Sequence, residues 1–209
     1  MNSPSPERIS IYWLKDLSSV DLESLRRRIL ATFLSCLEGE IQIERSETGK
    51  PILKSPRPTP DVHFSTSHTD DLWVLAVCRG RRIGIDIENR TASEPVLDLA
   101  ERYYTNEEQI LLRETEIERQ GELFLASWTK KEALIKARGD AISHGLDRFG
   151  TQLMGFSSKQ IFYEEGGICG KSWTIRRLDE WNGFLCHLAV ENADRFQIEV
   201  KELANGYLE

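Results

Sequence analysis

The sequence predicts an α+β fold, in which strands and helices are grouped along the chain. Three observations predict it: a strand followed by a helix near the start, three extended runs before the middle, and strands again after two helical segments. A doubly wound parallel sheet requires strict alternation of strand and helix, which this order lacks. The 209 residues are enough for one domain or for two small halves that share an interface.

The first part of the chain is expected to contain one strand and one helix. The run ISIYWL, at 9–14, has the apolar and aromatic composition of a strand. Between Val20 and Leu37, apolar residues recur at the three- and four-residue spacing of a helix. The proline-rich stretch at 55–61 then excludes regular structure, because proline lacks a backbone N–H.

Three extended runs, at 62–67, 72–78 and 82–88, follow the proline-rich stretch. Only Arg79, Gly80 and Arg81 separate the last two runs, which predicts that they form a hairpin. The later elements are helical segments at 96–113 and 118–138 and strand-like runs at 159–165, 172–178, 184–190 and 195–200. A soft boundary near 92–106 divides the chain into an N-terminal α+β half, 1–102, and a C-terminal α+β half, 103–209.

Composition and charge restrict the functional classes. The formal net charge of −7 argues against a surface built to neutralise nucleic-acid phosphates, so we expect no nucleic-acid partner. The four cysteines (Cys36, Cys78, Cys169 and Cys186) form no CxxC pair, which argues against a zinc site. No apolar run approaches the roughly 20 residues that span a bilayer, and the first residues lack an apolar signal core. We therefore expect a cytoplasmic protein with no membrane partner.

The strand expected at 82–88 places two carboxylates on one face. Because side chains alternate along a strand, Gly84, Asp86 and Glu88 share one face and the isoleucines between them share the other. Alternate residues lie roughly 7 Å apart, so the two charges repel each other unless a cation or basic groups compensate them. A divalent ion with oxygen ligands would do so. The alternative is a solvated sheet edge, where carboxylates need no partner.

One carboxylate of the second long helix lies on its apolar face. At about 100° per residue, Glu132 falls in the same row as Lys136, whereas Lys130 points to the opposite, solvent side. A carboxylate on an apolar face needs a partner. That partner is either Lys136 alone, which would make the pair structural, or a metal ion shared with Asp86 and Glu88 across a cleft.

The segment HFSTSHT, at 63–69, places Ser67 beside His68 at the end of a strand. A hydroxyl group, an imidazole and nearby backbone donors can bind phosphate. The alternative for His68 is a hydrogen-bonded structural histidine, and neither residue has the spacing of a nucleophile elbow.

These segments, in this order, resemble the signature of the 4′-phosphopantetheinyl transferases, specifically the longer, pseudo-dimeric Sfp type. HFSTSHT resembles the family's phosphate-side Ser-His segment, IGIDIE (83–88) its metal-binding strand, and WTKKEALIKARGD (128–140) its Trp…Lys-Glu-Ala…Lys helix. A Gly-Lys-Pro at 49–51 also matches. The resemblance covers about residues 49–149 and implies two similar α+β halves in one chain, with coenzyme A held between them.

The resemblance also implies roles for individual residues, with Mg²⁺ as the metal and coenzyme A as the co-substrate. The implied metal ligands are Asp86, Glu88 and Glu132; the implied catalytic residues are Glu132, Lys136 and Asp86; the implied coenzyme A contacts are Lys50, Ser67, His68, Lys136 and Arg27. For Arg27 the alternative is a basic helix surface. Two departures, Ala141 in place of a common glycine and Asp140 where a basic residue often stands, concern the loop before Gly145 and leave the metal ligands intact.

The implied reaction is attack by a serine hydroxyl of an acyl or peptidyl carrier protein on the β-phosphate of coenzyme A, which releases 3′,5′-ADP. The candidate general bases are Glu132, Glu108 and a metal-bound water. For Glu108 the alternative is an acidic residue in the first turn of a helix, where the helix dipole favours it. A monomer is sufficient, because both halves lie in one chain. A metal-dependent phosphodiesterase or nuclease, and a binding module that has lost turnover, are the rival functions.

Overall fold

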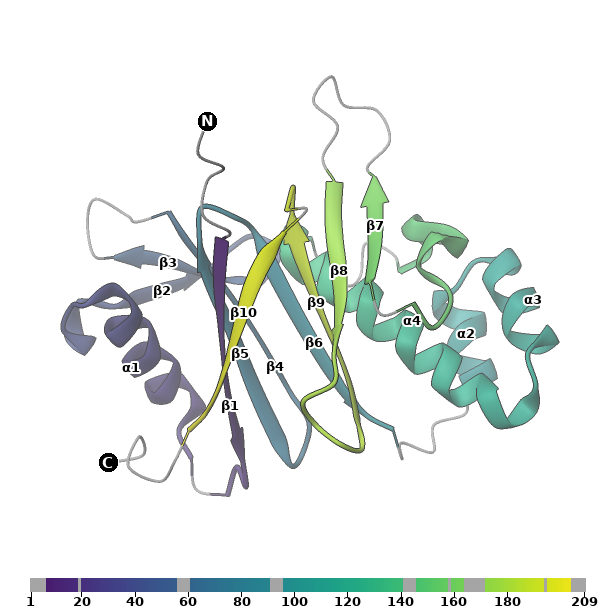
Figure 1. Ribbon diagram of the computed structural model, residues 1–209, viewed down its shortest axis with the longest axis horizontal. Helices are drawn as coiled ribbons and strands as arrows, with labels where there is room; N and C mark the ends of the chain where they lie inside the picture. Colours follow the sequence, from purple (N-terminus) through teal and green to yellow (C-terminus); the bar gives the residue numbers. More distant parts are fainter. Residues whose placement is uncertain are drawn as a thin grey trace.

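The computed structural model describes residues 7–18, 20–55, 61–90, 96–140, 146–157, 159–163, 172–193 and 195–203. Its strands form two four-stranded sheets, in the orders β10-β1-β5-β4 and β6-β9-β8-β7, and a small sheet of β2 and β3 (Figure 1). The strands are β1 (Glu7–Lys15), β2 (Gln42–Arg45), β3 (Pro51–Ser55), β4 (Val62–His68), β5 (Leu72–Arg79), β6 (Ile83–Asn89), β7 (Lys159–Tyr163), β8 (Ser172–Leu178), β9 (Phe184–Glu191) and β10 (Phe196–Glu202). The helices are α1 (Leu22–Leu34), α2 (Val96–Tyr103), α3 (Asn106–Glu114) and α4 (Ile117–Arg138), with short 3-10 helices at Glu38–Glu40 and Leu146–Leu153.

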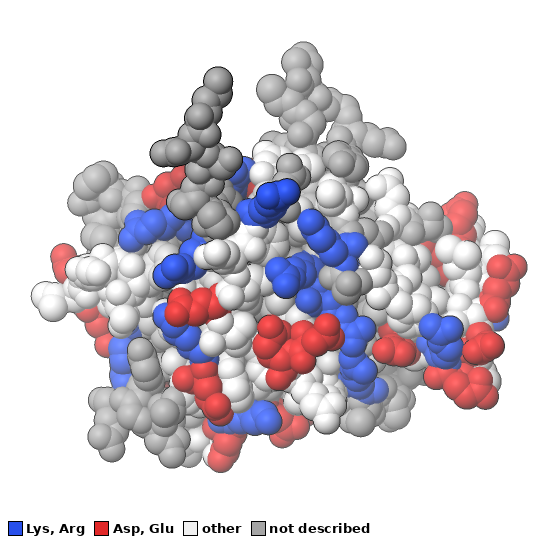
Figure 2. Space-filling view, viewed as in Figure 1, with Lys and Arg blue, Asp and Glu red and all other residues white. Residues whose placement is uncertain are grey.

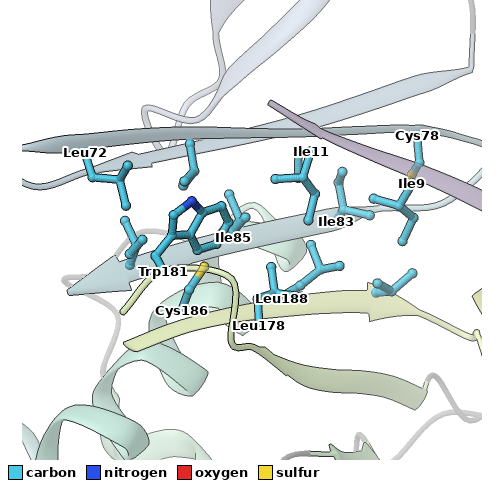
Figure 3. Close-up of a cluster of buried hydrophobic side chains, with 14 of the residues drawn as sticks. Ile9, Ile11, Leu72, Cys78, Ile83, Ile85, Leu178, Trp181, Cys186 and Leu188 are labelled. Carbon is cyan, nitrogen blue, oxygen red and sulfur yellow. The ribbon is translucent and has the colours of Figure 1, made fainter. Parts of the chain in front are cut away.

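The two large sheets pack face to face, and each carries a long helix on its outer side. The core between them includes Ile9 and Ile11 of β1, Ile83 and Ile85 of β6 and Leu188 of β9 (Figure 3). A second cluster packs the outer face of the first sheet against α1, and further clusters pack the second sheet against α4. The protein is therefore α+β with two similar halves, as predicted, and α1 and α4 lie on opposite sides of the paired sheets (Figure 1).

Strand β5 shows why its sequence is continuously apolar. Every residue from Leu72 to Cys78 is buried. Alternate side chains of this run enter the core between the sheets, and those between them pack under α1. A strand that is covered on both faces needs apolar residues at every position, so LWVLAVC lacks the alternation of a half-exposed strand.

The hairpin predicted between 72–78 and 82–88 is wrong. β5 pairs with β1 and β4, whereas β6 pairs antiparallel with β9, with Asp86 opposite His187. A three-residue connection can join hairpin partners or carry the chain from one packed sheet to the next, and the connecting sequence does not distinguish the two. β10 returns to pair in parallel with β1, so the first sheet combines strands from both ends of the chain, while the second sheet combines β6 with three strands of the C-terminal part. The boundary at 102/103 stays a prediction.

The other expected elements are confirmed within the described residues, with two differences. The helical segment at 96–113 is two helices, because Thr105 caps a new helix: its Oγ1 accepts from the backbone N–H of Glu108, whose carboxylate accepts from the backbone N–H of Thr105. The β2–β3 hairpin was not predicted. Most of the proline-rich stretch (56–60), Cys169, Ala141 and Gly145 lie outside the described residues. Within the described ranges, no helix is long and apolar enough to cross a membrane.

Candidate active site

The site begins with the close approach of α4 to β6 at Gly84. A Cβ atom at this position would overlap the backbone of Ala133 and Ala137, so only glycine allows the helix to lie this near the strand. Asp86 and Glu88 share the Gly84 face of β6 and therefore point toward α4, while the isoleucines enter the core between the sheets, as predicted.

Ser67, Asp86 and Lys136 form a hydrogen-bonded triangle. The Lys136 ammonium donates to Asp86 Oδ1 at 2.6 Å and to Ser67 Oγ at 3.1 Å, and Ser67 Oγ donates to Asp86 Oδ1 at 2.8 Å. Ser65, two residues earlier on β4, accepts from the backbone N–H of Ile85 at 3.1 Å. Side-chain hydrogen bonds thus join β4 to β6, where the edges of the two large sheets meet. The structure thus brings together three candidate site residues, Ser67, Asp86 and Lys136, from three separate segments of the sequence.

Glu132 and Glu88 have no such partner. Glu132 is only 4% exposed, yet neither carboxylate makes a hydrogen bond or ion pair with any residue that the structure describes. Burial, and then the charge of Asp86, raise the pKa of Glu132 to about 7, and the same two causes raise the pKa of Glu88 to about 7. Lys136 opposes both shifts without cancelling them. The structural pair of Glu132 with Lys136 is therefore not observed, because the ammonium bonds to Asp86.

Most acidic side chains of this chain are exposed, so the buried carboxylates of the site are unusual. On the face shown in Figure 2, acidic and basic side chains lie exposed and interspersed, which is typical of a solvated surface. Asp86 is 3% exposed, and its second oxygen, Oδ2, is buried without a hydrogen-bond partner among the described residues. Burying such groups is unfavourable unless a positive charge compensates them.

Asp86, Glu88 and Glu132 have the oxygen donors that a hard divalent cation prefers, although the described side chains do not form a preorganised metal site. No group of three or more His, Cys, Asp or Glu residues within the described ranges is arranged to hold a metal ion. The donors, however, are carboxylates, of which Asp86 has a buried unpaired oxygen, and burial, followed by the Asp86 charge, raises the pKa values of Glu88 and Glu132. Oxygen ligands with excess negative charge are the ligands that Mg²⁺ prefers.

Lys50 lies between two pockets next to this triangle. Its ammonium is 3.4 Å from the carbonyl oxygens of Ile83 and Ala137, and burial, with the nearby Arg82 charge, lowers its pKa to about 8. One pocket, of about 220 Å³, also contacts Lys136 and Asp140; the other, of about 380 Å³, also contacts Arg82 and Arg138. A ligand that entered either pocket would contact Lys50.

The two remaining predicted contacts lie at different distances from the triangle. His68 is exposed at the end of β4, directly after Ser67. Arg27 is on α1, where its guanidinium pairs with Glu23, and Figure 1 shows α1 on the far side of the first sheet from α4. The structure does not bring Arg27 into this cluster. The role of each residue in binding stays a prediction.

One prediction for the helix that carries Glu132, the exposure of Lys130, is wrong. Lys130 was expected to point to solvent but is buried: it donates to the carbonyl oxygen of Gly155 at 2.7 Å, and burial, with the Arg177 charge, lowers its pKa to about 8. Helical periodicity correctly places Lys130 on the side of α4 opposite Glu132. That side, however, is covered by the segment that follows the 3-10 helix at Leu146–Leu153. Lys131 is also fully buried and pairs with the fully buried Glu108 at 2.6 Å.

Two features of the site were missed. His187, opposite Asp86 on β9, is buried with its Nδ1 2.7 Å from Thr129 Oγ1, and burial together with the Lys130 and Arg177 charges lowers its pKa to about 3. The β2–β3 turn, which carries Lys50, contacts the end of α4 through Thr48. His187 is the one histidine in the otherwise apolar run 184–190, but no sequence signal paired β9 with β6.

Comparison with known families agrees with this arrangement. The model of the 4′-phosphopantetheinyl transferase superfamily matches residues 82–188, and that of the 4′-phosphopantetheinyl transferase N-terminal domain matches residues 12–80. The first match contains β6, α4 and β9, which carry Asp86, Glu132 and His187. The second contains Lys50 and Ser67.

Curated relatives agree with these matches. The chain is 35% identical to the 4′-phosphopantetheinyl transferase HetI of Nostoc sp. over 56% of this chain and 49% of that protein. It is 31% identical to Sfp of Bacillus subtilis over 62% of this chain and 55% of that protein, and 28% identical to gsp of Aneurinibacillus migulanus over 90% and 76%. It thus spans about half the length of HetI and Sfp. On the family matches, the chain belongs to the 4′-phosphopantetheinyl transferase superfamily and is of the Sfp type.

Proposed function

We propose that this protein transfers the 4′-phosphopantetheine group of coenzyme A to a serine of an acyl or peptidyl carrier protein, in an Mg²⁺-dependent reaction. The observation that carries the proposal is the pair of unpartnered carboxylates, Glu88 and Glu132, beside the triangle of Ser67, Asp86 and Lys136. Family membership supports the reaction class.

In this proposal the basic residues bind the phosphates. Lys136 and Ser67 present an ammonium and a hydroxyl at the junction of β4 and β6, and His68 lies exposed next to them. Lys50, between the two pockets, would hold the nucleotide end of coenzyme A. Arg27 would contribute only if coenzyme A extended toward α1.

Asp86, Glu88 and Glu132 would hold Mg²⁺. When bound, the ion supplies positive charge that stabilises the negative charge developing on the phosphate oxygens. The same charge would offset the burial and the Asp86 repulsion that raise the pKa values of Glu88 and Glu132.

Glu132 is our candidate for the general base. The carrier serine oxygen forms a bond to the β-phosphorus of coenzyme A, the bond from that phosphorus to the bridging oxygen breaks, and 3′,5′-ADP leaves with the electron pair. The serine proton passes to a carboxylate. Glu132 suits this role better than Glu108, because Glu132 has no partner among the described residues and Glu108 is committed to Lys131.

The test is intact-mass analysis of an apo carrier protein incubated with the protein, coenzyme A and Mg²⁺. We expect a gain of one phosphopantetheine group that is lost without metal and lost in Asp86→Ala. Lys201→Ala, on β10, serves as a comparison variant that removes a half-exposed charge outside the proposed site.

Absence of any mass gain with several acyl and peptidyl carriers would overturn the proposal. Coenzyme A binding in the same samples would then identify a binding module without turnover, and hydrolysis of nucleic acid would identify the rival metal-dependent nuclease. A cytoplasmic location and a monomeric state stay predictions of the same proposal.

A further inference from the structure

The turn between β2 and β3 makes a polar contact with the end of α4. Thr48 Oγ1 donates to the carbonyl oxygen of Gly139 at 2.5 Å, although 91 residues separate them in sequence. The turn itself is well ordered by hydrogen bonds: Ser46 Oγ lies 2.9 Å from Thr48 Oγ1 and accepts from the backbone N–H of Lys50 at 3.1 Å. Because Thr48 gives its only hydroxyl proton to Gly139, Ser46 is the donor to Thr48.

The last carbonyl groups of α4 are bonded from outside the helix. A helix leaves its final carbonyl oxygens without intrahelical partners. At the end of α4, three successive carbonyl oxygens accept from other parts of the chain: that of Ala137 from Lys50, that of Arg138 from Arg82, and that of the C-cap residue Gly139 from Thr48. The β2–β3 hairpin therefore supplies two of these three donors, and the Thr48 bond is the shortest of them.

The Thr48–Gly139 bond spans two walls of the smaller pocket. The hairpin lines one side of this pocket with residues 48–51, and another side is lined by Ile135 and Lys136 of α4 and by Asp140, two residues after its end. Lys136 lies one turn before Gly139 and carries the ammonium that bonds to Asp86. The bond thus fixes the distance between Lys50 on the hairpin and Lys136 on the helix.

The hairpin is held differently at its base and at its tip. At the base, Leu53 is buried in the cluster that packs under α1, and so is Ile41, which precedes β2. At the tip, Thr48 and Lys50 donate hydrogen bonds to carbonyl oxygens at the end of α4. Removing the Thr48 hydroxyl therefore loosens the tip without disturbing the apolar base.

We propose that Thr48 is a positioning residue that holds the hairpin tip against α4. It thereby fixes the shape of the smaller pocket, where Lys50 would hold the nucleotide end of coenzyme A. The inference rests on the proposed function. Thr48 acts on binding through Lys50 and the pocket wall, and it touches no reacting atom. Its loss should affect affinity rather than the chemical step.

The test compares Thr48→Val, which keeps the shape of the side chain but removes the donor, with Thr48→Ser, which keeps the donor. We expect Thr48→Val to raise KM for coenzyme A about 3- to 10-fold, as for the loss of one hydrogen bond, with kcat changed less than about twofold. Thr48→Ser should restore wild-type KM. Thr115→Val is the matched control, because Thr115 Oγ1 donates in the same way to the carbonyl oxygen of Leu111 on α3.

Calorimetric titration with 3′,5′-ADP separates this inference from the proposed function, because it requires no turnover. Weaker 3′,5′-ADP binding by Thr48→Val than by Thr48→Ser and Thr115→Val would support the positioning role. Unchanged affinity and KM, with or without a lower melting temperature, would overturn it, and so would a fall in kcat at constant KM. A wild-type protein that binds 3′,5′-ADP but modifies no carrier would contradict the proposed function alone.

Discussion

Two buried glutamates on neighbouring helices, Glu108 on α3 and Glu132 on α4, differ in their partners. Glu108 is fully buried, accepts from Lys131 at 2.7 Å and completes the capping box at the start of α3. Lys131 also lies 4.1 Å from the centre of the Tyr104 ring. Glu132, the residue after Lys131, is almost as buried but has no partner among the described residues. Of the two adjacent residues, Lys131 thus stabilises the fold, and Glu132 points into the site.

The difference teaches how to distinguish a structural buried charge from a functional one. In the matched pair each charge offsets part of the desolvation of the other, so the pair gains little from an added ion. An unmatched carboxylate is unfavourable to the fold unless something binds to it, so its persistence indicates a site. The same contrast separates Asp86 Oδ1, which bonds to Lys136 and Ser67, from the unpaired Asp86 Oδ2.

The largest expected effect is loss of turnover in Glu132→Gln. Removing the carboxylate should lower kcat by about 10²- to 10⁴-fold, because both the proposed base and one proposed metal ligand are lost. The melting temperature should not fall, since the substitution removes an unpaired buried charge. Wild-type rates at saturating Mg²⁺, measured by carrier mass gain over time, would remove Glu132 from the mechanism.

The next largest effect is loss of stability in Glu108→Gln. This substitution leaves the Lys131 ammonium buried without its counter-ion and should lower the free energy of unfolding by about 3–5 kcal/mol, measured by urea denaturation. Turnover per folded molecule should fall only modestly. The double variant Glu108→Gln, Lys131→Met should recover part of the stability, and a kcat loss as large as that of Glu132→Gln would make Glu108 the base instead.

The smallest expected effect is a pH dependence of the melting temperature that arises from the Glu132 carboxyl group. The pKa of Glu132 is about 7 in the folded protein and near 4.5 when unfolded, so without metal its ionisation destabilises the fold as pH rises between these values. Glu132→Gln should therefore melt at nearly the wild-type temperature at about pH 4.5 and about 2–6 °C above it at about pH 8. Added Mg²⁺ should reduce this difference, and a difference independent of both pH and Mg²⁺ would contradict the unmatched charge.

The sequence predicted the parts of the site that follow from local periodicity. The facing of Asp86 and Glu88 needs only the two-residue repeat of a strand, and the row of Glu132 and Lys136 needs only the helical repeat. Partners depend on tertiary packing, which local periodicity does not contain. The Lys136 ammonium therefore bonds to Asp86 rather than to Glu132, Lys130 is covered by a later segment, and β6 pairs with β9 rather than with β5.

The β2–β3 hairpin was missed for a different physical reason. β2 has four residues and β3 has five, which is too short for either repeat to be recognised. Its residues are partly exposed, so no apolar pattern marks the strands either. The Gly-Lys-Pro resemblance located Lys50 but gave no reason to expect Thr48 at the end of α4.

The parallel pairing of β10 with β1 has a consequence for how the chain folds. Glu7 pairs with Phe196, so a further 189 residues must be made after Glu7 before this contact can form, and its loop-closure entropy is correspondingly large. During synthesis β1 has one free edge, which can pair with another chain until β10 arrives. The first sheet should therefore be completed late, and slow refolding with concentration-dependent aggregation is the expected behaviour of denatured protein returned to native conditions.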